Sequence, residues 1–172
     1  ASHRLVDRVV ALSAVDSANF ATIYSSSRPG GIQPFVVREY VNGVTLLAIL
    51  GHLKQVGSPF SVAAAASVAD GLHAIHAAGC VPGTLKLTNV FVQQAGGIQL
   101  VDPAVTPVIA DNKILQAPEI DLDAEATVPS DIYALGMLLK VLAAADDADP
   151  LGQLIAECTH RDPGARPKSA EA

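Results

Sequence analysis

The residues with the clearest capacity for chemistry lie in the segment Pro82-Gly83-Thr84-Leu85-Lys86-Leu87-Thr88-Asn89. The segment holds a cation, Lys86, and an amide, Asn89, but no carboxylate. A general base that removes a proton from a hydroxyl must titrate near neutral pH, and such a base contributes roughly 10²–10⁴ in rate. The hydroxyl of Thr84 does not titrate in that range. The segment therefore predicts a loop that can position groups but cannot abstract a proton.

Four further landmarks follow this segment along the chain. Apolar residues on both sides of the Gly96-Gly97 turn predict two short strands, and the second strand leads into Asp102. Beyond them stand three more motifs: Ala117-Pro118-Glu119, Ser130-Asp131-Ile132-Tyr133-Ala134-Leu135-Gly136 and Arg161-Asp162-Pro163-Gly164-Ala165-Arg166-Pro167. Landmarks in this order and at these distances are hard to obtain by chance.

Their order resembles that of bacterial eukaryotic-like Ser/Thr protein kinases, and the resemblance covers nearly the whole chain. In that family the loop reads H-R-D-L-x-x-x-N, in which Asp accepts the substrate proton and Asn holds magnesium. The resemblance places Thr84 at the Asp position and Asp102-Pro103-Ala104 at the metal-binding D-F-G motif. Pro103 fixes its own φ and Ala104 lacks the conformational range of glycine, so we expect this switch to be frozen. The chain is identified as a degenerate member, a pseudokinase, with no catalytic residue.

The same resemblance leaves part of a nucleotide site. Lys86 matches the phosphate-facing lysine, and Asn89 and Asp102 match the two magnesium ligands. Glu39 and Val41 fall on the segment that resembles the hinge, where a nucleotide would bind. Two interpretations stay open: a vestigial site that binds ATP and magnesium weakly, or residues kept because the shape of the loop requires them. No cofactor is expected to be necessary.

Upstream, residues 34–46 resemble the last N-lobe strand, the hinge and the start of the next helix. Apolar residues at helical spacing over 5–15 predict a helix, and residues 19–24 read as a strand. Turn-forming residues predict a loop over 25–31. No glycine-rich phosphate loop and no V-A-I-K lysine is found before these elements. We therefore expect the chain to begin within the N-lobe, and whether the natural protein has the earlier strands stays open.

Two cations stand where the family has other residues. Arg38 falls at the gatekeeper position, which is usually apolar, so its side chain must reach solvent or a carboxylate. Arg8 falls at or near the position of the C-helix glutamate, which in the family pairs with the missing lysine. If that register holds, the pair cannot form.

Other motif residues are interpreted as structural. The resemblance pairs Glu119 with Arg166, whose planar guanidinium suits a bidentate bond, and lets Asp131 hold the backbone of the loop. His73 and His76 lie three residues apart on the helix before the loop, but no third ligand at a suitable spacing follows. A metal site is therefore not predicted there.

Composition indicates a globular domain of 172 residues, half of them apolar, without an apolar run long enough to span a membrane. The net charge of −6 without a basic stripe argues against nucleic-acid binding. The two cysteines, Cys80 and Cys158, have no metal or disulfide spacing and are predicted to be buried, reduced thiols.

The sequence thus predicts an α+β, protein-kinase-like two-lobed fold with a truncated N-lobe and a mainly α-helical C-lobe. Residues 1–41 would form the partial N-lobe up to the hinge and residues 42–172 the C-lobe. A short activation segment, 102–119, would separate the hairpin from the A-P-E motif, with Thr106 as its only hydroxyl-bearing residue.

High alanine and valine content resembles actinobacterial proteins, and the chain is similar to the intracellular domain of mycobacterial MviN-type peptidoglycan-precursor flippases. This resemblance implies a cytoplasmic scaffold domain, attached to the membrane only through segments outside this chain. It also implies two partners: an active Ser/Thr kinase that phosphorylates the protein, and a forkhead-associated (FHA) protein that reads phosphothreonine. Thr106, Thr127 and Thr159 are candidate threonines in this chain. The alternatives are an atypical kinase of low activity and a nucleotide-binding sensor.

Overall fold

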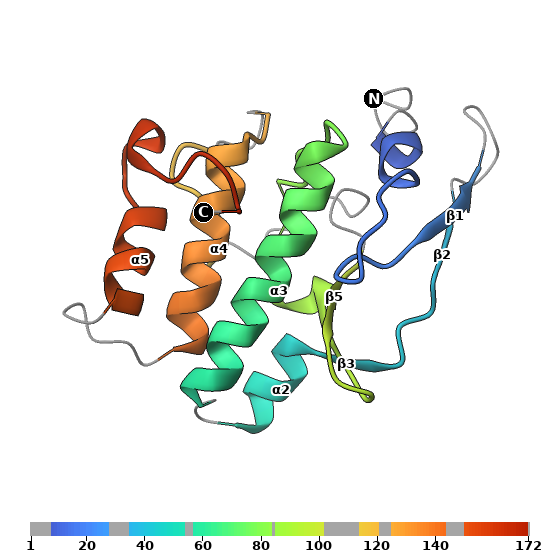
Figure 1. Ribbon diagram of the computed structural model, residues 1–172, viewed down its shortest axis with the longest axis horizontal. Helices are drawn as coiled ribbons and strands as arrows, with labels where there is room; N and C mark the ends of the chain where they lie inside the picture. Colours follow the sequence, from blue (N-terminus) through green and yellow to red (C-terminus); the bar gives the residue numbers. More distant parts are fainter. Residues whose placement is uncertain are drawn as a thin grey trace.

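The three longest helices lie side by side at one side of the molecule, and a two-stranded sheet lies at the opposite side (Figure 1). The computed structural model describes residues 8–27, 35–53, 57–83, 85–101, 114–120, 125–143 and 150–171. Residues 8–12 are helical, and the other helices are α2 (Leu46–His52), α3 (Ser58–Ala77), α4 (Val128–Leu142) and α5 (Pro150–Cys158). The strands are β1 (Ile23–Ser26), β2 (Val36–Arg38), β3 (Gly43–Thr45), β4 (Val90–Gln93) and β5 (Ile98–Leu100), and there are short 3-10 turns at Leu87–Asn89 and Pro163–Ala165.

The two central helices, α3 and α4, begin at recognisable signals. Gly57 and Pro59 open α3, since proline fits the first turn of a helix where no backbone donor is needed. Thr127 caps α4: its hydroxyl accepts from the Ser130 amide, and the Ser130 hydroxyl accepts from the Thr127 amide. None of the described helices is both long enough and apolar enough to cross a membrane.

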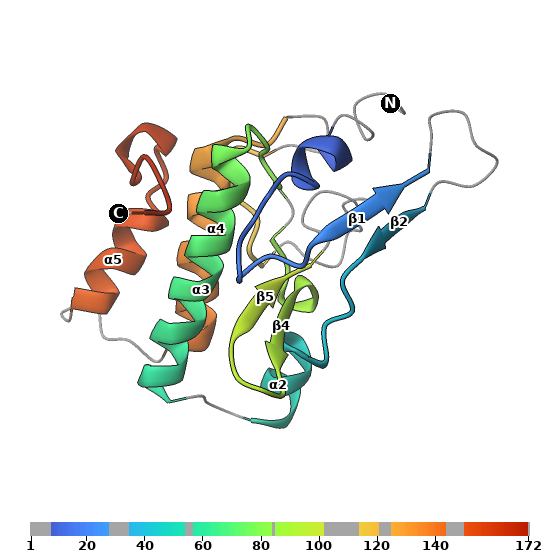
Figure 2. The ribbon, with the colours of Figure 1, turned by 45° about the vertical axis from the view of Figure 1, so that its right-hand side comes forward.

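The strands form two antiparallel sheets. β1 pairs with β2, and β4 lies between β3 and β5 in the second sheet. The predicted hairpin around Gly96-Gly97 is confirmed as β4–β5, with Val92 opposite Ile98, and β5 packs on α3. Figure 2 shows β1 and β2 extending away from this hairpin.

The predicted strand over 19–24 is wrong in position. Its first residues turn toward β5 instead: Phe20 bridges Leu100, and the Asn19 side chain donates to the Ile98 carbonyl at 2.9 Å. The strand proper, β1, begins at Ile23 and continues through Ser26, so the first two residues of the predicted loop over 25–31 belong to it. The shift follows from a change of pairing partner: residues 19–21 bond to Leu100 of β5, whereas the chain from Ile23 onward pairs with β2. Phe20 is 1% exposed at this junction.

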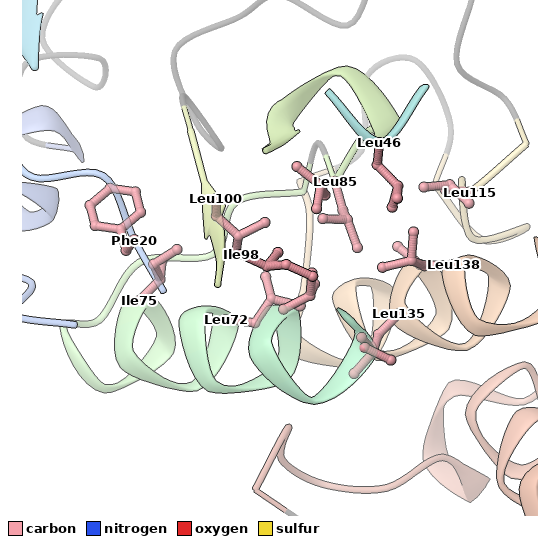
Figure 3. Packing of buried hydrophobic residues seen from close by; sticks show 14 of the residues in the cluster. Phe20, Leu46, Leu72, Ile75, Leu85, Ile98, Leu100, Leu115, Leu135 and Leu138 are labelled. Atoms are coloured by element: carbon pink, nitrogen blue, oxygen red, sulfur yellow. The ribbon is translucent and has the colours of Figure 1, made fainter. Parts of the chain in front are cut away.

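One hydrophobic core joins elements from the whole described chain. In Figure 3, Phe20 and Leu100 lie over Leu72 and Ile75 of α3, and Leu138 of α4 lies further along the same layer. Val9 and Leu12 of the helical residues 8–12 belong to the same cluster. The predicted boundary between residues 41 and 42 stays a prediction, and both of its sides contribute to this core.

Candidate functional site

The loop that carries the predicted chemistry is held from α4. Gly83 has a φ of +66°, and its amide donates to Oδ1 of Asp131 at 2.9 Å. Four residues further on, the chain turns into the 3-10 segment Leu87–Asn89, where the Asn89 amide donates to the Lys86 carbonyl at 2.9 Å. The predicted role of Asp131 is therefore confirmed. Thr84 itself lies outside the described residues.

Asp131 is deeply buried and has a second partner. Its Oδ2 lies 2.9 Å from Nε2 of His76 on α3, and its side chain is 1% exposed. Burial raises the pKa of the Asp131 carboxyl, and the hydrogen bond with His76 opposes that rise. His73 lies 4.0 Å from Glu171 instead, so the two histidines serve different contacts. No group of three His, Cys, Asp or Glu side chains suited to a metal occurs among the residues that the structure describes.

Of the predicted phosphate and metal residues, the structure describes Lys86 and Asn89. The carbonyl of Asn89 accepts from the Val101 amide at 2.8 Å, which brings Asn89 next to the residue preceding Asp102. Asp102, Pro103 and Ala104 lie outside the described residues. Lys86 is 6% exposed and lines a cavity of about 30 Å³ together with Asp131 and Gln116. Such a cavity has room for about one water molecule.

At the hinge, the backbone carbonyl of Glu39 is already engaged. Nη1 of Arg38 donates to it at 3.1 Å, so the half-buried cation predicted at the gatekeeper position bonds to the segment predicted as the hinge. The Glu39 carboxylate accepts from the Thr22 amide at 3.2 Å, and the Glu39 amide donates to the Thr22 carbonyl at 2.8 Å. Val41 is buried in a small cluster with Ala21, Val101 and Phe91. Of the two predicted cofactor residues, Glu39 is thus hydrogen-bonded to Arg38 and Thr22, and Val41 is packed in an apolar cluster.

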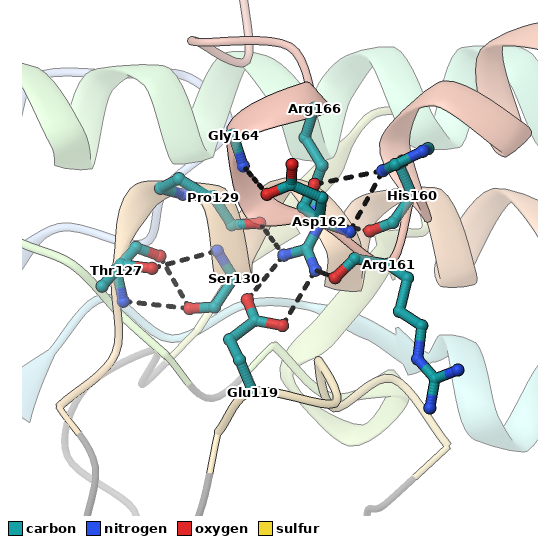
Figure 4. A network of polar contacts seen from close by, with 9 residues as sticks. All are labelled: Glu119, Thr127, Pro129, Ser130, His160, Arg161, Asp162, Gly164 and Arg166. Atoms are coloured by element: carbon teal, nitrogen blue, oxygen red, sulfur yellow. Dashed lines mark hydrogen bonds and ion pairs between the residues drawn. The ribbon is translucent and has the colours of Figure 1, made fainter.

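The predicted pair of Glu119 and Arg166 is confirmed (Figure 4). Nη1 and Nη2 of Arg166 donate to Oε1 and Oε2 of Glu119 at 2.6 Å and 2.8 Å, a bidentate arrangement. The guanidinium also donates to the carbonyls of Pro129 and His160 and lies 4.9 Å from the centre of the Tyr133 ring. This hydrogen bonding lowers the pKa of the Glu119 carboxyl, against the opposite effect of burial. Through Arg166, this network connects Glu119 and the start of α4 to the C-terminal residues 160–166.

Both cysteines are free and buried, as predicted. Burial raises the pKa of the Cys158 thiol to about 11, and the nearby Glu157 adds to the rise. Cys158 lines a second cavity of about 200 Å³, an apolar one between α3, α4 and α5 that does not include the residues of the loop segment. Neither thiol is set up for nucleophilic chemistry.

Three residues that contact the candidate site were not predicted from the sequence. Phe91 packs beside the hinge, Gln116 lines the small cavity, and Thr22 binds both the amide and the carboxylate of Glu39. The alternation of β4 could have placed the Phe91 side chain on one face of the hairpin, but nothing in the sequence says that this face meets the hinge.

Similar sequences come from one class of enzyme. No protein-family model matches the chain. It is 31% identical over 118 residues to serine/threonine-protein kinase PknE of Mycobacterium tuberculosis, covering 62% of this chain and 21% of that protein. It is 28% identical over 150 residues to PknL of the same species, covering 81% of this chain and 37% of that protein. Probable serine/threonine-protein kinase PknB of Lactococcus lactis is 25% identical over 118 residues, which is 62% of this chain and 19% of that protein.

The fold has a close counterpart among solved structures. The PknI kinase domain of M. tuberculosis superposes with a TM-score of 0.77 at 16% sequence identity, covering 98% of this chain and 74% of that one. The aligned segments span between about a fifth and somewhat more than a third of the length of the curated relatives. The chain therefore has a protein-kinase-like α+β fold, and its homologues are bacterial Ser/Thr protein kinases.

Proposed function

We propose that the chain is a catalytically inactive protein-kinase-like domain, a pseudokinase, which serves as a regulatory scaffold. The observation that carries the proposal is the residue at position 84. A threonine replaces the proton-accepting carboxylate of the family, in a loop whose neighbouring backbone is still held by the bond from Gly83 to Asp131. This combination is expected for a domain whose loop conformation is still needed but whose phosphoryl transfer, which requires the base, is not.

The hinge supports the same proposal. An adenine bound there would have to share the Glu39 carbonyl with Arg38, which already occupies one of its two lone pairs, and would need apolar space beside Val41, where Phe91 packs. If the two donors do not fit together, displacing the guanidinium costs about 1–3 kcal/mol of the binding free energy. We therefore expect ATP to bind weakly or not at all.

The pattern of contacts around the threonines bears on the proposed phosphorylation. The Thr127 hydroxyl caps α4, and the half-buried Thr159 hydroxyl donates to the Ile155 carbonyl at 2.7 Å. An FHA protein needs a phosphothreonine that protrudes from the surface; Thr127 is exposed at the start of α4, whereas Thr159 is half-buried and bonded within the protein. Among the three candidates, Thr159 is therefore the least suited, which leaves Thr127, Thr106, which lies outside the described residues, or a threonine outside this chain.

In its widest form the proposal concerns cell-wall synthesis. The domain would be the cytoplasmic pseudokinase part of a mycobacterial MviN-type peptidoglycan-precursor flippase, phosphorylated by an active Ser/Thr kinase and then bound by an FHA protein. Support comes from the resemblance of the sequence and from homologues in M. tuberculosis, PknE and PknL. The scaffold network around Glu119 and Arg166 would keep the binding surface folded without nucleotide.

Calorimetric titration of ATP into the full chain, with and without magnesium, tests the central proposal. We expect no heat of binding at millimolar nucleotide and no transfer of labelled phosphate to the chain or to a protein substrate. Magnesium-dependent binding that disappears in Asp102→Asn, accompanied by phosphate transfer, would contradict it. The FHA step is tested separately: binding should appear only after treatment with an active kinase and should disappear after dephosphorylation.

A nucleotide-binding sensor is the second candidate function. The observation that favours it is the bond from the Val101 amide to the Asn89 carbonyl, which ties the predicted magnesium residue Asn89 to the residue that precedes Asp102 in the sequence. Binding of ATP and magnesium without any phosphate transfer would select the sensor over the nucleotide-free scaffold.

A further inference from the structure

Two contacts tie the helical residues 8–12 to the segment that leads into the loop. Nη2 of Arg8 donates to the Val81 carbonyl at 2.9 Å, across 73 positions of sequence. In the opposite direction, the Cys80 thiol donates to the Arg8 carbonyl at 3.8 Å. The same two short stretches of chain are thus joined twice, once through the Arg8 side chain and once through its backbone.

This link continues into the centre of the molecule. Val81 lies two residues before Gly83, whose amide is bound to Asp131, and Asp131 is bound in turn to His76 of α3. The positive charge of Arg8 opposes the effect of burial on the pKa of both Cys80 and Asp131. A polar chain of contacts therefore runs from residue 8 through the loop segment to α4 and α3.

The apolar face of the same helical stretch is already fixed. Val9 and Leu12 are 4% and 0% exposed in the main core, whereas Val10 is 61% exposed. These close-packed apolar contacts hold one face of the stretch against the core. The bond from the exposed Arg8 side chain to the Val81 carbonyl adds a directional contact toward the loop segment.

We propose that Arg8 is a positioning residue that locks the helical residues 8–12 to the loop segment 80–83, so that their arrangement is the same with and without nucleotide. In active protein kinases, the glutamate of the corresponding helix pairs with a lysine, and the position of that helix is a point of control. Here the contact is made to the protein's own backbone. The functional meaning of the lock, a surface kept constant for a partner, rests on the proposed scaffold function.

Hydrogen exchange of backbone amides in the full chain tests the lock. Arg8→Met keeps most of the side-chain length and loses the donor, so we expect roughly twofold to tenfold faster exchange at the amides of Cys80, Val81 and Gly83 and of residues 9–12. Arg8→Lys retains a charged donor and should restore part of the protection. Arg161→Met is the matched control, since it removes an exposed guanidinium that points away from Glu119 and Arg166 (Figure 4).

Exchange in the Met and Lys variants that is equal and as slow as in the unmodified chain would overturn the proposal, because it would mean that only the aliphatic stem matters; equally fast exchange in both would show that the guanidinium itself is required. Exchange in Arg8→Met equal to that of the unmodified chain would overturn it as well. A second test needs no variant: millimolar ATP and magnesium should leave exchange of residues 80–83 in the unmodified chain unchanged, and a clear change would contradict the lock. If calorimetry detects ATP binding while this exchange stays constant, the lock holds and the nucleotide-free scaffold fails, so the two failures are distinguishable.

Discussion

Arg166 is the residue on which the C-terminal network depends. Its side chain is 0% exposed, and its guanidinium reaches a carboxylate and several carbonyls at once. A buried guanidinium needs such partners, because an unpaired charge in the interior is strongly unfavourable. Glu119, at 28% side-chain exposure, is the more accessible member of the pair. The pair therefore stabilises the fold, and its strength is reduced by solvent on the carboxylate side.

Glu119→Gln should lower the free energy of unfolding by about 1–2 kcal/mol, because the neutral amide leaves the buried Arg166 charge without its counter-ion. Urea denaturation at neutral pH measures the loss. Glu157→Gln, an exposed change on α5, serves as the control and should fall within about 0.5 kcal/mol of the unmodified chain. A Gln variant as stable as the control would show that the pair contributes nothing to stability.

The same pair predicts a dependence on pH. Arg166 lowers the pKa of Glu119 in the folded state below its ordinary value of 4.5. A lowered folded pKa means that the stabilisation is complete above the ordinary value and is lost as the pH falls through the lowered one. The difference in unfolding free energy between the unmodified chain and Glu119→Gln should therefore shrink from neutral pH to about pH 3. A difference that stays constant over this range would contradict the assignment.

At the scale of elements, the loop segment packs closely against the chain just before α4, at Gly83 and Ala126. Gly83 has a φ of +66°, and a Cβ built on it would lie 2.1 Å from Cβ of Ala126. Gly79, at a φ of +75°, has open space around the same position. Both glycines have a left-handed backbone, but only Gly83 has a close neighbour. Comparing alanine substitutions at the two positions therefore separates the cost of backbone strain from the cost of steric crowding.

Gly83→Ala should destabilise the chain by about 2–4 kcal/mol, through a left-handed backbone and a steric conflict with Ala126. Gly79→Ala should cost only the backbone part, about 1–2 kcal/mol. Thermal or urea unfolding measures both, and the double variant Gly83→Ala with Ala126→Gly should recover the difference. If the two single variants lose equal stability, the contact between the loop and residue 126 is not tight.

The junction of α4 and α5 gives a second prediction at this scale. A Cβ on Gly136 of α4 would lie 2.5 Å from Cβ of Cys158, whereas Gly51 of α2 has nothing within 4 Å. Gly136→Ala should destabilise by about 1–3 kcal/mol, and Gly51→Ala should stabilise by up to about 1 kcal/mol through helix propensity. Opposite signs in urea denaturation are the expected result. A stabilising Gly136→Ala would mean that α5 can move away from α4 freely.

At the scale of the whole molecule, the described segments share one hydrophobic core. Leu12 is fully buried in the cluster that contains Leu72 of α3 and Leu138 of α4. Strands and helices from both sides of the predicted boundary at residues 41 and 42 contribute to it. We therefore expect the described segments to unfold together.

Leu12→Ala should lower the free energy of unfolding by about 2–5 kcal/mol and shift one cooperative transition. Far-ultraviolet circular dichroism and hydrogen exchange of α4 should report the same midpoint. Val10→Ala, which removes a side chain that is 61% exposed, is the neighbouring control and should change stability by less than about 0.5 kcal/mol. Separate transitions for the two probes would show that the parts fold independently.

Much of the fold was predictable from local pattern and from motifs. Turn residues between apolar runs predicted the hairpin β4–β5, and the family resemblance predicted the start of α2 at Leu46 and the start of α4 near Ser130. The position of β1 was not predicted, because Phe20 pairs with Leu100 of β5 and the pairing with β2 starts only at Ile23. Strand boundaries depend on partners that are distant in sequence, and the pattern of one segment does not contain them.

For the site, the sequence alone determined the residue types: a threonine at position 84, a lysine at 86, an asparagine at 89, and a complementary pair at 119 and 166. Only the tertiary structure decided their contacts. It placed Arg38 on the Glu39 carbonyl, Phe91 beside Val41, and Arg8 on Val81, contacts between residues up to 73 positions apart. Chemical capacity is a property of the side chain and is visible in sequence, whereas a hydrogen bond between distant residues exists only once packing has brought donor and acceptor within about 3 Å.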